Sequence, residues 1–124
     1  MPFRVSMWVP VEPAAISAVL EGLVALDYLL LRTGRYPALY EAGIRYKRQN
    51  DPHRWASVHE VMAAGYADCK NLSAWRAAEF RLQGIPARVI ARPSSRTTWH
   101  AIVLLPDGRT EDPSALLGMR RRRR

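Results

Sequence analysis

The spacing of the apolar residues changes at Gly84-Ile85-Pro86, and this change limits the fold more than any other feature of the sequence. Before it, apolar residues recur mostly at every third or fourth position, which predicts helices with one buried face. After it they alternate with polar residues, which predicts strands. The fold class is therefore expected to be α+β, with helices packed on a small antiparallel sheet. The expected helices cover residues 14–32, 37–48, 57–64 and 69–83, and the expected strands cover residues 3–9, 87–92 and 99–105.

The length of 124 residues suits one compact domain, which we expect over residues 1–119, followed by an arginine tail at residues 120–124. The net charge is +8, but residues 1–119 hold 14 basic and 11 acidic side chains, so the tail supplies most of the excess. The single cysteine, Cys69, excludes an intrachain disulfide framework and a zinc site built from several thiolates.

The most apolar stretch, residues 14–31, is interrupted by Glu21 and Asp27 and does not follow a basic segment. A membrane span needs ~20 apolar residues, and a secretory signal begins with a basic region. We therefore expect this stretch to be a core helix, and the chain to be cytoplasmic without a signal peptide or a transmembrane segment.

Cys69 is predicted to be the first residue of the clearest helix in the chain, which Asp68 can cap. The helix macrodipole and the unpaired backbone N–H groups at this end favour a thiolate. The backbone N–H of Cys69 is the first candidate donor to an oxyanion. The alternative is that Cys69 is a small buried apolar side chain, as free cysteines usually are. The expected inward stripe of this helix consists of Leu72, Trp75, Ala78 and Leu82.

Residues 105–109 (LPDGR) predict how the last strands pair. Proline and aspartate suit the central positions of a type I turn, and glycine suits the left-handed residue after it, so that Leu105 pairs with Arg109 across a three-residue loop. In this register His100 and Asp112 share a face as diagonal neighbours within side-chain reach. A two-residue loop would place them on opposite faces. The alternative for His100 is an ordinary histidine at a strand start, and the alternative for Asp112 is an Asp-Pro turn residue.

Five short segments of the second half follow a recognisable order. They read GYADCKNL at 65–72, GIPA at 84–87, WHAIV at 99–103, DG at 107–108 and EDPS at 111–114. Together, over residues 55–119, they resemble the transglutaminase-like superfamily, whose pattern is a helix-start cysteine followed by a strand histidine and a strand aspartate. The resemblance implies a papain-like core with Cys69 as nucleophile, His100 as general base and acid, and Asp112 as the residue that orients the imidazole. The chain departs from the family at Asn71, where many relatives have an acidic residue, and at Ala67, where glycine is frequent.

The longer run from residues 39–43 (LYEAG) to 117–119 (LGM) also resembles small transglutaminase-like proteins encoded among phage structural genes. This resemblance implies a virion-associated protein with a protein or peptide substrate, and with a phage capsid or packaged nucleic acid as a further partner. The alternative for the tail is a solvated end without a partner. The tail residues that would contact nucleic acid or an acidic partner are Arg120, Arg121, Arg122, Arg123 and Arg124.

The side chain that would complete an oxyanion site is not evident from the sequence. Papain-like enzymes often carry a side-chain donor about six residues before the cysteine, where this chain has Ala63. Trp55 is a candidate through its indole N–H, although a tryptophan is more often a core residue. His53 and His59 lack the spacing of a zinc motif and are interpreted as surface histidines, so neither a metal nor a cofactor is expected.

The expected function is hydrolysis of an amide or ester bond, or acyl transfer from it, through Cys69, His100 and Asp112. Proteolysis, deamidation and crosslinking all fall within this chemistry. Two other classes stay open: a virion structural or assembly component of the same fold with little or no catalysis, and a peptide-binding module without turnover.

Overall fold

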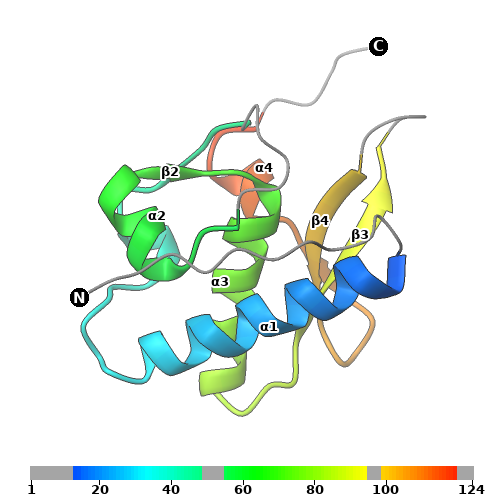
Figure 1. The fold of residues 1–124 in the computed structure, drawn as a ribbon, viewed down its shortest axis with the longest axis horizontal. Coiled ribbons are helices and arrows are strands. Elements are labelled where there is room, and N and C mark those ends of the chain that lie inside the picture. Colours follow the sequence, from blue (N-terminus) through cyan, green and yellow to red (C-terminus); the bar gives the residue numbers. More distant parts are fainter. Residues whose placement is uncertain (1–12, 49–54, 95–98, 120–124) are drawn as a thin grey trace.

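The computed structural model describes residues 13–48, 55–94 and 99–119, and these form a mixed arrangement of helices and small sheets, confirming the α+β class (Figure 1). Two predicted segments, the strand at 3–9 and the turn at 50–52, lie outside the described residues. In chain order the elements are α1 (Pro13–Leu31), η1 (Leu39–Glu41), β1 (Arg45–Tyr46), α2 (Val58–Ala64), β2 (Tyr66–Ala67), α3 (Cys69–Leu82), β3 (Arg88–Pro93), β4 (Trp99–Leu104), β5 (Thr110–Glu111) and α4 (Pro113–Leu116).

Two sheets flank the central helix α3. β3, β4 and β5 form an antiparallel sheet with β4 in the middle, and β1 pairs with β2 in parallel. α3 packs against β3 and β4 on one side and against α1 on another, and α4 lies beside the end at which α3 begins (Figure 1). This arrangement brings the start of α3, the middle strand β4 and the chain after β5 to the same region.

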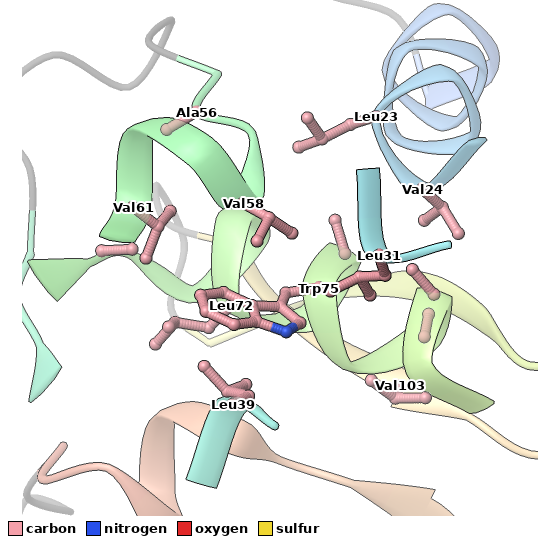
Figure 2. Close-up of a cluster of buried hydrophobic side chains, with 14 of the residues drawn as sticks. Leu23, Val24, Leu31, Leu39, Ala56, Val58, Val61, Leu72, Trp75 and Val103 are labelled. Atoms are coloured by element: carbon pink, nitrogen blue, oxygen red, sulfur yellow. The ribbon is translucent and has the colours of Figure 1, made fainter. Parts of the chain in front are cut away.

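The core is built around α3, because nine of its 14 residues are buried. Trp75 and Leu72 are fully buried at the centre of the apolar cluster (Figure 2). Leu39 from η1 and Val58 from α2 pack against them, so that both flanking segments are fixed to the same helix. Burying a side chain of this size stabilises the fold by about 1.5–3 kcal/mol, and the core therefore holds the start of α3 in place.

Among the described residues, α1 is the one helix long and apolar enough to cross a membrane by length and composition. A core helix and an N-terminal signal pass the same test. Leu23 and Val24 of α1 are buried in the core cluster, and the Asp27 carboxylate is buried with them. Asp27 Oδ1 accepts a hydrogen bond from the Val58 backbone N–H at 2.9 Å, which ties α1 to the start of α2.

The local signals in the sequence set most helix ends correctly. α1, α2 and α3 match the predictions at 14–32, 57–64 and 69–83, and Ser57 caps α2 by accepting from the Glu60 N–H. Gly65, with φ of +81°, ends α2 in the left-handed conformation that glycine adopts readily. The chain can therefore turn directly from α2 into β2.

The predicted helix at 37–48 is wrong. The structure has one short 3-10 turn, η1, followed by Gly43 at φ +73° and the strand β1. The Tyr46 N–H donates to Leu117 O and the Lys47 N–H donates to Ala67 O, both at 2.9 Å. These long-range backbone hydrogen bonds replace the helical ones that the local sequence favours.

One member of the predicted inward stripe of α3 is also misplaced. Leu72, Trp75 and Ala78 are fully buried as predicted, whereas Leu82 is 42% exposed. The buried face ends at Phe80, because Leu82 lies in the last turn, after which Gly84 turns the chain towards β3.

Candidate active site

Cys69 is the first residue of α3, and local hydrogen bonds fix its position. Asp68 has extended backbone angles and caps the helix by accepting from the Asn71 N–H at 3.3 Å, as the sequence predicted. Residues at this position of a helix have no intrahelical acceptor for their N–H groups, so the Cys69 N–H is free of the helical ladder. The side chain of Cys69 is partly exposed.

A single strand residue, Ala101, attaches β4 to the start of α3. Its backbone N–H donates to Cys69 Sγ at 3.5 Å, and its carbonyl accepts from Ser73 Oγ at 3.0 Å. β5 pairs with β4 only at Leu104 and Val103, so the edge of β4 at Ala101 faces α3 instead of a strand. The thiol therefore lies against the residue that follows His100.

The hairpin has the predicted three-residue loop. The Leu105 N–H donates to Arg109 O at 2.8 Å, and β4 and β5 pair Val103 with Glu111. This register places His100 and Asp112 on one face, and His100 Nε2 lies 2.8 Å from Asp112 Oδ2. The predicted juxtaposition is confirmed, and the two-residue loop is excluded.

Both carboxylate oxygens of Asp112 are engaged. Oδ2 binds His100, and Oδ1 accepts from the Ala115 N–H at 3.3 Å, so that Asp112 is also the N-cap of α4. The side chains of His100 and Asp112 are 20% and 26% exposed, so the pair is reached by solvent but mostly shielded from it. Because Nε2 is directed to Asp112, Nδ1 is the ring nitrogen that this carboxylate does not engage.

Burial and nearby groups act on the Cys69 thiol in opposite directions. Burial raises the pKa of the Cys69 thiol above its ordinary value of 9.0. The Ala101 N–H and Lys70 act in the opposite direction, and Asp68 adds to the increase. The helix end and the desolvation of the side chain therefore act on the thiol in opposite directions.

We expect the Cys69 thiolate to form only above the pH range of an ordinary cysteine, because the neutral thiol is the better form in a desolvated position. The check is the thiolate absorbance at about 240 nm during a pH titration, taken as the difference between the native chain and a Cys69→Ser variant. Subtraction removes the tyrosine contribution. A thiolate already present near neutral pH would contradict this assignment.

The residues on either side of Cys69 form a small cluster of charge and aromatic surface. Lys70 Nζ pairs with Asp68 Oδ2 and also lies 5.4 Å from the centre of the Trp55 ring. Asn71 Oδ1 accepts from the Ala56 N–H at 2.9 Å and so fixes the chain beside Trp55. Trp55 therefore lies next to the residue that follows Cys69, and its use as an oxyanion donor stays a prediction.

A partly buried ionic network that sequence reasoning missed supports the chain beside Asp112. Arg76 Nε binds Glu111 Oε2, and Arg76 Nη1 binds Glu79 Oε1 at 3.1 Å. The Tyr40 hydroxyl donates to Glu111 Oε2 at 2.6 Å. Only the pair of Arg76 and Glu79, three residues apart on a helix, has a signal in the sequence. The network joins η1, α3 and β5, and it holds the residue immediately before Asp112.

Of the other candidates from the sequence, His59 is the one that lies among the described residues. His59 is exposed on α2, where its Nδ1 lies 2.9 Å from the Tyr36 hydroxyl oxygen. The remaining candidates lie outside the described residues. They are His53, Arg120, Arg121, Arg122, Arg123 and Arg124.

Comparison of the chain with protein-family models, with curated proteins and with solved structures gives no match. The function is therefore inferred from the geometry of the described residues.

Proposed function

We propose that the chain is a cysteine-dependent amide hydrolase or acyl transferase with a transglutaminase-like, papain-like core. Cys69 is the nucleophile, His100 the general base and acid, and Asp112 the residue that orients the imidazole. The observation that carries the proposal is the 2.8 Å contact of His100 with Asp112, next to the strand residue whose N–H reaches Cys69 Sγ. A nucleophile, a base and a group that orients the base are the parts required for thiol catalysis.

The raised pKa of Cys69 implies that the thiol loses its proton during attack rather than before it. As Sγ bonds to the carbonyl carbon of the substrate, the S–H proton passes to His100 Nδ1, and the carbonyl oxygen becomes an oxyanion. The N–H of Cys69, which has no acceptor within the helix, then donates to that oxyanion. His100 then gives the proton to the leaving amine as the C–N bond breaks, and a thioester on Cys69 remains.

Asp112 contributes by holding the ring and by stabilising the imidazolium that forms during attack. Its second oxygen is fixed by the Ala115 N–H, so the carboxylate is oriented before a substrate arrives. Such preorganisation reduces the rearrangement needed in the transition state.

The product depends on which molecule attacks the thioester. Water gives hydrolysis, and an amine gives a new amide bond. We propose a protein or peptide as the acyl donor, and a virion-associated role is the corresponding proposal for the biological setting. If an amine acceptor is used, the chain crosslinks or modifies its substrate; without one it acts as a protease or deamidase.

The proposal predicts that p-nitrophenyl acetate acylates the native chain on Cys69 at neutral pH, with one p-nitrophenolate released per chain in an initial burst. Intact-mass measurement and peptide mapping would locate the acetyl group, and the Cys69→Ser variant would show no burst. Addition of a simple amine would increase the rate of deacylation if transfer is favoured. A native chain that reacts no faster than free cysteine contradicts the proposal and favours the non-catalytic assembly component.

A further inference from the structure

The site needs a second donor to the oxyanion, because one backbone N–H stabilises only part of the charge that develops. We propose that Tyr46 is this donor, with its phenolic O–H directed to the oxyanion formed at Cys69. This inference rests on the proposed function and adds a residue to it. Position 63, six residues before the cysteine, is an alanine that can donate no side-chain hydrogen bond.

The backbone places Tyr46 between the two segments that carry the reactive groups. In the parallel pair of β1 and β2, Tyr46 is opposite Ala67, two residues before Cys69. The Tyr46 N–H donates to Leu117 O at 2.9 Å, just after the helix that Asp112 caps. Tyr46 is thus attached on one side to the chain leading into the nucleophile and on the other to the chain following Asp112.

The strand register also gives the direction of the side chain. Residues directly opposite in paired strands project to the same face of the sheet. Ala67 is fully buried, whereas its neighbour Tyr66 is 38% exposed, so the face shared by Tyr46 and Ala67 is the inner one. The Tyr46 ring packs against the core cluster on this face and remains partly exposed.

The charges around the phenol agree with this placement. Its charged neighbours, in order of their effect, are Cys69, Arg48, Asp68 and Asp112. Burial and then the negative charge of a Cys69 thiolate raise the pKa of Tyr46, and so the phenol keeps its proton at neutral pH. A protonated phenol on the face shared with Ala67, two residues before Cys69, can donate a hydrogen bond to a neighbouring oxyanion.

Lys70, the cationic side chain that follows Cys69, is engaged elsewhere. Its ammonium pairs with Asp68 Oδ2 and lies over the Trp55 ring. Both interactions would have to be broken before Lys70 could donate to an oxyanion. Tyr46, whose ring lies on the same inner face as Ala67, is therefore favoured over Lys70 as the donor.

The test compares two reactions of the same sulfur in a Tyr46→Phe variant. Acylation by p-nitrophenyl acetate passes through an oxyanion, whereas alkylation by iodoacetamide forms a C–S bond with loss of iodide and forms no oxyanion. We expect acylation to slow by about 100-fold, the typical effect of removing one oxyanion donor, and alkylation to keep its rate. Tyr66→Phe, on the exposed face of the paired strand, is the matched control and should leave both rates unchanged.

Each result decides the assignment. Equal acylation rates in the Tyr46→Phe and Tyr66→Phe variants overturn it, and so does an equal loss of acylation and alkylation, which would indicate a structural role. The alkylation rate also reports whether the variant has kept its folded site. If the native chain is acylated no faster than its His100→Ala variant, the proposed function itself is contradicted. The role of Tyr46, which depends on that function, is then contradicted as well.

Discussion

Replacement of His100 by alanine is expected to slow acylation of Cys69 by p-nitrophenyl acetate by about 10²–10⁴-fold, the usual contribution of a general base. The effect should be large because the pKa of Cys69 is raised by burial, so few chains hold a thiolate at neutral pH. Without His100, attack depends on that small thiolate fraction. The measurement is the rate of the p-nitrophenolate burst in the native chain and in the variant.

His59→Ala provides the matched control for this measurement. His59 is an exposed histidine on α2 that contacts Tyr36, and its removal should leave the burst rate unchanged. Unfolding by urea should show that both variants stay folded. Equal burst rates for His100→Ala and His59→Ala would remove the general base from the mechanism.

Replacement of Asp27 by asparagine is expected to remove one contribution to the pH dependence of the free energy of unfolding. Asp27 is fully buried, and burial raises its pKa from 3.8 to about 7, although the Val58 N–H lowers it in part. At a pH between these two pKa values, Asp27 is protonated in the folded chain and ionised in the unfolded chain. The free energy of unfolding therefore falls as the pH rises through this window, and it is constant with respect to Asp27 above about pH 7.

The expected loss of unfolding free energy depends on how much of the pH range between the two pKa values is measured. Between about pH 5 and about pH 8, the native chain should lose about 2–3 kcal/mol of unfolding free energy through Asp27, and Asp27→Asn should not show this loss. Urea unfolding measures the change in free energy between the two pH values, once for the native chain and once for Asp27→Asn. The effect of Asp27 is the difference between these two changes, in which the contributions of other titrating groups cancel. The control is Glu21→Gln, an exposed carboxylate on the same helix that pairs with Arg81. An unchanged pH dependence in Asp27→Asn would show that Asp27 is ionised in the folded chain at neutral pH.

Features governed by short-range rules could be predicted from the sequence. The Asp68 cap, the start of α3 at Cys69 and the three-residue hairpin loop each depend on fewer than about six neighbouring residues. The loop length then fixed the strand register, and the register placed His100 beside Asp112. The relation between two residues that are 12 positions apart was thus predictable, because one turn type connects them.

Features governed by tertiary contacts could not be predicted in this way. The segment at 37–48 has helical spacing, but pairing with Ala67 and Leu117 draws it into a strand. The pKa of Cys69 depends on how much water the packed chain excludes, and no local pattern reports this. The contacts of Arg76 and Tyr40 with Glu111 join residues 35 and 71 positions apart, which only the folded chain brings together.

The central claim is that Cys69, His100 and Asp112 act as one catalytic unit, and the acylation rate of a His100→Ala/Asp112→Asn double variant tests it most directly. Asparagine keeps the size of Asp112 and remains a good helix cap, so α4 should be preserved. If Asp112 acts only through the imidazole, Asp112→Asn slows the native chain but costs nothing further once His100 is absent. We predict equal rates for the double variant and for His100→Ala; a loss in the double variant equal to the product of the two single losses would contradict the account.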